Sequence, residues 1–328
     1  MAALPANVQP LAAIPNLSLI PQAPLGRYTR FGIGGPARFF CDTPDADAFA
    51  QALRLVRSAD LPHVVIGGGT NLIVSDEGFD GVVLRFTGSR IEREGDLLIA
   101  EAGAVLQDVV DGSIIFGLKG MESMTGIPGY LGAAIYGNAG AYGQSIQERV
   151  ERVYFTDGDR TTSFSNVECK FHYRESVFKT HKDWIIVRAD LQFVPGDSVE
   201  LAQRARAIRE TRDAKYPPSM KCAGSIFKNL FFANLPGAAK ADLPPSMVRD
   251  GKVPSAWFLE KVGAKGLRRG GIVVADYHAN LIYNEGQGTA AELVSVIAEL
   301  KQRVQDRFGF QLEEEVQYVG FEYAAAPV

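Results

Sequence analysis

The segment Gly126–Gly143 restricts the fold of this 328-residue chain more than any other. It reads GIPGYLGAAIYGNAGAYG, is rich in glycine and alanine, and carries no charged side chain. Such a segment cannot build a core from its own bulk, but its backbone can approach a large flat ligand and present N–H groups to oxygen atoms. A second run, GGGTN at residues 67–71, follows an apolar strand-like stretch and is typical of a phosphate-binding turn. Together the two surfaces predict a large cofactor that carries a diphosphate.

Length, composition and charge describe an ordinary globular protein. The length predicts about two domains, and a hydrophobic content of 46% with 22% charged residues is typical of a soluble chain. Because the net charge is −4, we expect no nucleic-acid partner. The three cysteines are far apart and form no CxxC pair, so we expect reduced thiols. The histidines show no metal-ligand spacing, and no metal site is predicted.

Residues 1–25 are apolar and interrupted by prolines, and no basic residue precedes Arg27. A secretory signal would begin with a charged region, so we expect none. The prolines also exclude a long helix, and with it a membrane span. We therefore predict a loose N-terminal arm and no membrane partner.

Hydrophobic periodicity predicts an α+β fold in preference to a doubly wound sheet. Expected helices cover residues 45–58, 105–116 and 199–213, and a last helix begins at the capping box Thr289–Glu292 and ends at Gly309. Expected strands cover residues 64–66, 81–86, 96–101, 150–157, 161–164, 184–194 and 310–319. A change of composition at Pro195 predicts a domain boundary there.

Polar clusters with possible chemistry do not decide the function by themselves. Ser225 could be a turn residue or a reactive hydroxyl, and no GxSxG elbow supports a hydrolase. Arg174 could be solvated or could bind a carboxylate or an oxyanion. Arg209, Arg212 and Lys215 are three apart and share a helix face, for which the pattern alone favours a solvated basic surface.

The expected C-terminal strand alternates between apolar and polar residues. This places Glu313 and Glu315 on one face, which a solvated surface explains without any function. Glu314 falls on the apolar face, and the pattern does not explain it.

Eight motifs in a fixed order nevertheless identify a family. They are Tyr28-Thr29 with Ile33–Ala37, Gly67–Leu72, Gly126–Gly129, Asn138–Gly143, Tyr173–Ser176, Ala223–Asn229, His278–Asn280 and Leu312–Val316. Each motif alone is weak, but in this order they resemble the UDP-N-acetylenolpyruvoylglucosamine reductases (MurB), flavoenzymes of bacterial peptidoglycan precursor synthesis. The resemblance covers about residues 27–320.

The resemblance implies a two-lobed FAD-binding domain of the vanillyl-alcohol-oxidase (PCMH) type and a C-terminal α+β substrate-binding domain. The expected parts are an arm at 1–25, the FAD domain at 26–195 with lobes near 26–88 and 89–195, the substrate domain at 196–320 and a tail at 321–328. It implies a cytoplasmic, monomeric enzyme with noncovalent FAD and with NADPH as hydride donor. Its substrate is UDP-N-acetylglucosamine enolpyruvate, which gains a hydride at C3 and a proton at C2 to give UDP-N-acetylmuramate. The short interval between Arg174 and Ser225 resembles the shorter subclass, which lacks a tyrosine loop.

The resemblance also assigns residue roles. Ser225 matches the proton donor to C2, and Arg174 and Glu315 match the pair that polarises the substrate and stabilises the intermediate. The cofactor-binding positions are Gly67, Gly68, Gly69, Thr70, Asn71, Ile127, Pro128, Gly129, Gly132, Asn138, Ala139, Gly140, Ala141 and Tyr142. The substrate-binding positions are Arg212, Lys215, Lys228, Asn229 and His278. On this basis the C-terminal end of the basic helix faces the UDP group and is not merely solvated.

Three positions depart from the family pattern. The family commonly has a basic residue where Gly32 stands and a proline where Leu230 stands. The segment 231–256 is longer than the usual link, and it is either a lid over the substrate or an Ω-shaped surface loop, with the surface loop favoured.

Two other functions are considered. A carbohydrate oxidase of the same superfamily often binds FAD covalently through a histidine or cysteine near the glycine turn. Here that turn carries Thr70 and Asn71, and His63 belongs to the preceding strand, so noncovalent FAD is favoured. A scaffold without catalysis is the second alternative, and retention of the three catalytic positions argues against it.

Overall fold

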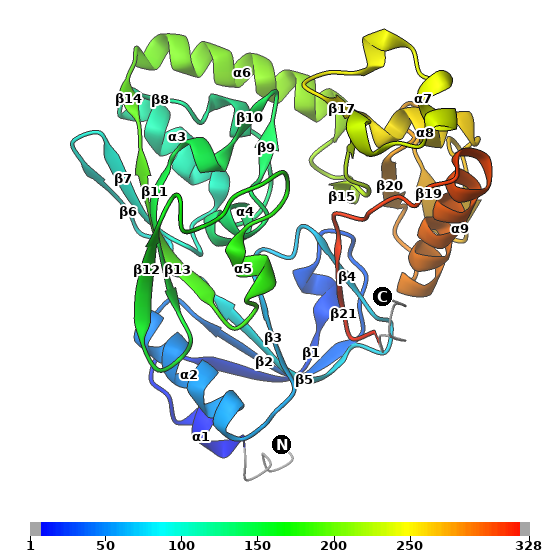
Figure 1. Ribbon diagram of the computed structural model, residues 1–328. Helices are drawn as coiled ribbons and strands as arrows, with labels where there is room; N and C mark the ends of the chain where they lie inside the picture. The colour runs from blue at the N-terminus through cyan, green and yellow to red at the C-terminus, as the bar shows by residue number, and fades with distance from the viewer. Residues whose placement is uncertain (1–7, 322–328) are drawn as a thin grey trace. The chain divides into compact units, whose positions relative to one another are not determined.

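The computed structural model describes residues 8–321, which form two compact units (Figure 1). Of these residues, 8–23, 37–69 and 80–218 belong to the first unit, and 24–36, 70–79 and 219–321 belong to the second. Most of the predicted C-terminal tail, residues 322–328, lies outside the described residues. The mixture of helices and antiparallel strands confirms the predicted α+β class.

The first unit contains a four-stranded sheet in the order β1-β2-β5-β3. Its strands are β1 (Ser18–Pro24), β2 (Pro36–Thr43), β5 (Phe79–Phe86) and β3 (His63–Ile66), and β3 runs parallel to β5. The predicted helix beside it is α2 (Ala46–Ser58), with Phe49, Leu53 and Val56 buried. The Asp45 carboxylate caps α2 by accepting the N–H groups of Asp47 and Ala48 at 2.9 and 3.0 Å.

The predicted loose arm is wrong for residues 8–25. Residues 9–12 form α1 (Gln9–Ala12), which packs on α2, and Leu11 and Ile14 are buried in the core of the unit. Residues 18–24 form β1, which contains Pro21 and Pro24. Both elements tolerate proline, because Pro10 lies in the first turn of α1 and β1 is an edge strand.

A second sheet of the first unit has the order β12-β11-β13-β7-β6, and all its neighbouring strands are antiparallel. The strands are β6 (Ile91–Glu94), β7 (Leu97–Glu101), β11 (Val150–Thr156), β12 (Thr161–Ser165) and β13 (Ile185–Gln192). Short pieces are β8 (Leu118–Lys119) paired with β14 (Val194–Pro195), and β9 (Gly140–Ala141) paired with β10 (Gln144–Ser145). The helices are α3 (Leu106–Ile115), η2 (Glu122–Met124), α4 (Leu131–Tyr136), η3 (Ile146–Glu148), α5 (Val177–Thr180) and α6 (Ser198–Lys215).

The compact units divide the chain differently from the boundary expected near Pro195. Helix α6 packs on α3 and η2, and its Leu201 and Ala205 are buried in the core of the first unit (Figure 1). The composition change marks the turn into α6, but the helix stays with the unit that holds the glycine-rich segments. The second unit begins instead at Ser219 and also includes residues 24–36 and 70–79.

The second unit is built on an antiparallel sheet in the order β15-β20-β19-β18. Its strands are β15 (Lys221–Ser225), β18 (Arg268–Arg269), β19 (Ile272–Val274) and β20 (Leu281–Asn284). Helix α9 (Ala290–Phe308) packs on β18, β19 and α8 (Ser255–Lys261) (Figure 1). Thr289 and Glu292 form the predicted capping box, and α9 ends at Gly309 with φ +77°. A short 3-10 helix, η1 (Leu25–Tyr28), also belongs to this unit.

The predicted C-terminal strand is shorter than expected. Only Gln317–Val319 forms a strand, β21, which pairs in parallel with β4 (Leu72–Val74). Residues 313–315 lie just before β21 and bond to the residues that follow Ser225, not to β4. The C-terminal segment therefore changes neighbours along its length. Glu314 forms an ion pair with Lys301 of α9 at 2.8 Å, which explains a carboxylate on the apolar side of this segment.

The long segment 231–256 folds on itself. Its ends pair as β16 (Leu230–Phe231) and β17 (Lys252–Val253), and between them lie η4 (Phe232–Asn234), α7 (Gly237–Ala241) and η5 (Pro245–Met247). Leu235, Ala239 and Leu243 of this segment are buried. Paired ends are one feature of an Ω-type surface loop, the favoured of the two interpretations, which stays a prediction.

All three cysteines are buried and unpaired, and burial raises the pKa of Cys41 and Cys169 to about 12, so neither forms a thiolate near neutral pH. Among residues 8–321, no cluster of His, Cys, Asp and Glu side chains could hold a metal ion. Within the same part of the chain, no helix combines the length and the apolar character that crossing a membrane requires.

Candidate active site

The two glycine-rich surfaces pack against each other within the first unit. A Cβ at Gly68 would lie 3.2 Å from the Cα of Gly129, and one at Gly67 would lie 3.3 Å from the Cβ of Ala133. The turn after β3 therefore meets the beginning of α4 closely, and the Tyr130 ring also lies against Gly68. Gly69 is left-handed, with φ +64°, which glycine adopts without strain.

This turn also keeps backbone donors for an anion. Within residues 8–321, no hydrogen bond is donated by the N–H of Gly68 or Gly69. Successive N–H groups in such a turn form a concave anion site. The residues present therefore fit the diphosphate of FAD, because a backbone cradle that a Cβ would fill carries N–H groups for phosphate oxygens.

Several predicted cofactor residues have polar groups engaged inside the protein, among them the N–H groups of Ile127 and Ala139, which donate to the carbonyls of Met124 and Ala134 at 3.0 and 2.8 Å. The N–H of Gly132 donates to the carbonyl of Ala102 at 2.8 Å. Asn138 is buried, and its amide donates to the His172 carbonyl at 2.7 Å and to Gln147 Oε1 at 3.1 Å. These residues shape the backbone of the segment. The other predicted positions in it, Ile127, Pro128, Ala139, Gly140, Ala141 and Tyr142, are at least partly exposed and accessible to a ligand.

Arg174 adopts an unusual backbone conformation beside this segment. Its φ is +60°, and His172 and Glu175 pair around it through N–H to carbonyl bonds of 3.0 and 3.1 Å. The guanidinium donates to the carbonyls of Gly140 at 3.0 Å and Asn138 at 3.4 Å. Positive φ is costly for a residue with a side chain, so the turn closed by His172 and Glu175 must hold Arg174 in this conformation.

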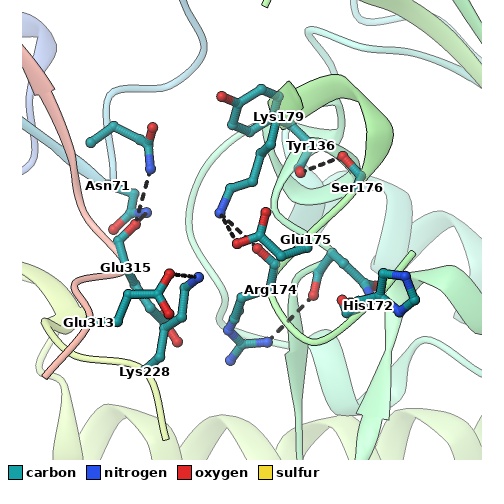
Figure 2. Close-up of polar contacts among 12 residues, drawn as sticks. Asn71, Tyr136, His172, Arg174, Glu175, Ser176, Lys179, Lys228, Glu313 and Glu315 are labelled. Carbon is teal, nitrogen blue, oxygen red and sulfur yellow. Dashed lines mark hydrogen bonds and ion pairs between the residues drawn. The ribbon is translucent and has the colours of Figure 1, made fainter. Parts of the chain in front are cut away.

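Lys179 and Ser176 hold the turn that carries Arg174. Figure 2 shows Lys179 Nζ donating to the Arg174 carbonyl at 2.7 Å and pairing with the Glu175 carboxylate at 3.2 Å. The Ser176 hydroxyl donates to the Tyr136 carbonyl at 2.7 Å, which ties α5 to the end of α4. Burial first and the charge of Glu175 second raise the pKa of the Tyr136 phenol, which therefore stays protonated at neutral pH.

The basic face of α6 contacts the start of the glycine-rich segment. A Cβ at Gly126 would lie 3.2 Å from Cδ and Nε of Arg212 and 3.6 Å from Nη1 of Arg209. Both arginines are half-buried, whereas Lys215 and Arg206 are exposed. The C-terminal end of α6 is therefore not a plain solvated surface, because two of its cations lie against the cofactor segment.

Ser225 lies at a kink in the second unit. It ends β15 opposite Leu281, and the register shifts between Cys222 and Ser225, so the strand bulges. Gly224 in the bulge has φ +77°, and a Cβ there would meet no atom within 4 Å, so glycine serves conformation and not close packing. Bulges of this kind redirect side chains next to functional sites. Ser225 itself is half-exposed.

Glu315 is held in register with the residues that follow Ser225. The Glu315 N–H donates to the carbonyl of Ile226 at 2.7 Å, and the Lys228 N–H donates to the carbonyl of Glu313 at 2.9 Å. Asn71 adds a side-chain bond, because its amide donates to the Glu315 carbonyl at 2.9 Å (Figure 2). Asn71 thus supports a predicted catalytic residue as well as belonging to the glycine turn.

Three of the predicted substrate residues, Lys228, Asn229 and His278, belong to the second unit. Lys228 is 8% exposed and pairs with the Glu313 carboxylate, as Figure 2 shows. Asn229 follows it and is exposed. The His278 ring accepts the Asn280 N–H at Nδ1, at 3.1 Å, so in the neutral ring Nε2 carries the proton. Thr70 is half-exposed.

Comparisons with known proteins agree with these features. Residues 216–319 match the family model described as UDP-N-acetylenolpyruvoylglucosamine reductase, C-terminal domain, and residues 40–162 match that of an FAD binding domain. The UDP-N-acetylenolpyruvoylglucosamine reductase of Solibacter usitatus is 56% identical over 310 residues, which cover 94% of this chain and 99% of that protein. The chain belongs to the MurB family. The MurB-type reductase of Carboxydothermus hydrogenoformans is 34% identical over 301 residues, 90% of this chain and 92% of that protein.

A solved MurB structure supports the fold. The crystal structure of the MurB of Thermus caldophilus has a TM-score of 0.71 and 28% identity, covering 92% of this chain and 98% of that one. This MurB family member therefore has the predicted combination of an FAD-binding fold and a C-terminal α+β domain.

The sequence did not identify every residue that shapes the site. The motifs assign no role to Lys179 or Asn280, and they do not predict that Arg209 packs on Gly126. Lys179 lies four residues after Glu175, and this helical spacing was the available signal. The contacts of Asn280 and Arg209 join distant segments, so no local pattern shows them.

Proposed function

We propose that this chain is the NADPH-dependent flavoenzyme that reduces UDP-N-acetylglucosamine enolpyruvate to UDP-N-acetylmuramate, a step of peptidoglycan precursor synthesis. The observation that carries the function is the match to MurB reductases over almost the whole chain. The fit of the glycine turn to a diphosphate adds an independent physical argument. A monomeric state and a cytoplasmic location stay predictions, since both rest on the resemblance alone.

Ser225 is proposed as the proton donor. When bound, FAD would supply the hydride that C3 of the enolpyruvyl group receives, with NADPH as its source. The C2–C3 double bond then becomes a single bond, and its electron pair collects at C2 next to the carboxylate. The Ser225 hydroxyl gives its proton to C2, and the resulting alkoxide regains a proton from solvent. A hydroxyl is a weak acid, but a carbanion-like C2 is basic enough to accept its proton.

Arg174 and Glu315 are proposed to stabilise charge during this step. As the electron pair collects at C2, negative charge spreads onto the substrate carboxylate, and a guanidinium can bind both oxygens. Glu315 can help only if it donates a hydrogen bond itself or accepts one from a neighbouring donor. A bare carboxylate would repel the intermediate. The Glu315 backbone donates to the Ile226 carbonyl and accepts from the Asn71 side-chain amide, and these two bonds hold the residue at the position from which it would act.

The residues proposed for the cofactor and the nucleotide come from the resemblance to the family. The backbone of residues 67–71 and of the glycine-rich segment would hold FAD, and Tyr142 and Pro128 are exposed in that segment. Arg212 and Lys215 on α6 are proposed to bind phosphate oxygens of the UDP group. Lys228, Asn229 and His278 are proposed to bind the same substrate from the second unit.

Lys215→Ala is expected to raise KM for the UDP sugar by about ten- to a hundredfold, because one charge-assisted hydrogen bond is lost. The affinity for FAD should change little. Steady-state kinetics and flavin titration of the apoprotein measure the two effects. Arg206→Ala is the matched control, since Arg206 is an exposed cation of the same helix. Equal losses of both affinities in Lys215→Ala would contradict the assignment.

The visible spectrum of the purified protein tests the proposed function. We expect a flavin band that NADPH bleaches and that the enolpyruvyl sugar restores without oxygen. Acid precipitation should release the flavin into the supernatant, because no covalent link is expected. A colourless protein that binds no added FAD would reject the function, and flavin that stays in the pellet would favour a covalent oxidase.

A further inference from the structure

Asn280 is a buried side chain that binds both backbone groups of one residue. Asn280 is 2% exposed. Its Oδ1 accepts the Phe227 N–H at 2.9 Å, and its Nδ2 donates to the Phe227 carbonyl at 2.8 Å. The Asn280 backbone carbonyl also accepts the N–H of Ile226 at 3.1 Å. Asn280 therefore acts as a strand partner for the two residues that directly follow Ser225.

A second buried side chain completes this network. Nδ2 of Asn280 also donates to Ser255 Oγ at 2.7 Å, and Ser255 Oγ lies 3.3 Å from the Phe227 carbonyl, to which it donates. Ser255 is fully buried at the first position of α8. The polar atoms of Asn280 are thus engaged by partners with fixed positions. Such satisfied networks are rigid, because any displacement leaves a buried polar group unpaired.

The opposite edge of the same segment carries Glu315. The Ile226 carbonyl accepts the Glu315 N–H at 2.7 Å, while the Ile226 N–H is held by Asn280. Asn280 and Glu315 therefore grip one peptide segment from two sides. The Asn280 N–H in addition donates to His278 Nδ1 at 3.1 Å, which sets the ring tautomer of a proposed substrate residue.

We propose that Asn280 is a positioning residue for proton transfer: its side chain sets the position of the Ser225 hydroxyl relative to Glu315. This inference rests on the proposed function, because it needs a protonation step at Ser225. Asn280 touches neither substrate nor cofactor in this role and acts only through residues 226 and 227. Removing its amide leaves the N–H and carbonyl of Phe227 without these two bonds, while Ile226 and Lys228 keep their backbone bonds to Asn280, Glu315 and Glu313.

Asn284 provides a control for a purely structural role. It is 4% exposed and lies in β20 of the same sheet. Its Oδ1 accepts the N–H groups of Gly286 and Gly288, each at 2.8 Å, and its Nδ2 donates to the Phe31 carbonyl at 2.9 Å. Asn284→Ala therefore removes a similar number of buried bonds without touching the Ser225 segment. Loss of stability is expected to be comparable in the two variants.

The test compares two half-reactions in the FAD-loaded enzyme by stopped flow. In Asn280→Ala, anaerobic reoxidation of the reduced flavin by the enolpyruvyl sugar should slow by roughly ten- to a hundredfold, because a displacement of about 1 Å of a catalytic group has effects of this size. Reduction of the flavin by NADPH needs no proton from Ser225 and should stay within about twofold of the unmodified enzyme, the scatter that we attribute to packing changes alone. Asn284→Ala should leave the ratio of the two rates unchanged.

Ser255→Ala supplies a graded second variant. It removes one partner of Nδ2 but leaves both Asn280 bonds to Phe227, so its effect on reoxidation should fall between the unmodified enzyme and Asn280→Ala. Thermal unfolding midpoints, and substrate affinity of the oxidised enzyme measured by flavin spectral change, are recorded for all variants. Selective slowing of reoxidation, with similar midpoints for the two asparagine variants, supports the proposal.

Two results would overturn the inference and can be told apart from failure of the function. If Asn280→Ala slows both half-reactions equally, or behaves as Asn284→Ala does, Asn280 is only structural. If Asn280→Ala does not fold, an unchanged reoxidation rate in Ser255→Ala rejects the network by itself. If the unmodified enzyme is not reoxidised by the enolpyruvyl sugar, the proposed function has failed and not the role of Asn280 alone.

Discussion

Ser225→Ala is expected to slow transfer from the reduced flavin to the enolpyruvyl sugar by about 10²- to 10⁴-fold, the usual contribution of a positioned acid. Without the hydroxyl, no side chain at the end of β15 gives a proton to C2, and solvent must deliver the proton. Reduction of the flavin by NADPH should continue at the unmodified rate, because that step adds no proton to the substrate. The folded structure should persist, since Ser225 is half-exposed and loses a single oxygen.

Stopped-flow measurement of both half-reactions checks this expectation. Ser225→Cys is the matched variant, because a thiol keeps a transferable proton in nearly the same volume. It should fall between the unmodified enzyme and Ser225→Ala, with a pH dependence set by its own thiol. An unchanged reoxidation rate in Ser225→Ala would remove the serine from the mechanism.

Among the described residues, local sequence signals predicted the four longest helices, α2, α3, α6 and α9, but not the shorter ones. The boundaries of α2 and α9 follow from side-chain caps, Asp45 and Thr289, which satisfy backbone N–H groups at the first turn. Gly309 ends α9 for an equally local reason, its left-handed conformation. Such signals act within a few residues, so they can be predicted without knowledge of the fold.

Pairing between distant segments could not be predicted in the same way. Proline content suggested a loose arm, yet β1 is accepted at the edge of a sheet, where a missing N–H costs no ladder bond. Residues 313–315 and 317–319 have one continuous pattern but bond to different neighbours, the Ser225 segment and β4. Likewise, α6 follows a composition boundary but packs with the first unit. Each of these outcomes depends on the distant residues that pack or pair with the segment. A local sequence pattern holds no information about them.

The candidate site shows the same division between residue identity and geometry. Motif order assigns catalytic roles to Ser225, Arg174 and Glu315, and these assignments stay predictions that rest on the resemblance. It did not show that Asn71 supports the Glu315 backbone or that the Asn138 side chain is engaged inside the protein. It also gave no sign that Arg174 adopts a left-handed conformation. Support of this kind comes from distant backbone groups and becomes visible only in the folded chain.

The left-handed backbone of Arg174 allows a test that separates catalysis from stability. Asparagine tolerates this conformation better than arginine, so Arg174→Asn should relieve backbone strain while it removes the cation. We expect the thermal midpoint to be maintained or raised. Reoxidation of the flavin by the enolpyruvyl sugar should nevertheless slow by about 10²- to 10³-fold, the usual cost of removing one group that stabilises developing negative charge.

Lys170→Asn controls for the backbone change alone. Lys170 is exposed, also has positive φ, +48°, and belongs to the same stretch of chain without a predicted role in the site. This variant should gain similar stability and keep both half-reactions at the unmodified rates. Arg174→Lys adds a further distinction, because it keeps the charge but loses the planar fork that reaches the Gly140 and Asn138 carbonyls together. Full activity in Arg174→Asn would show that the strained conformation serves the fold and not the chemistry, whereas partial activity in Arg174→Lys would separate the contribution of charge from that of geometry.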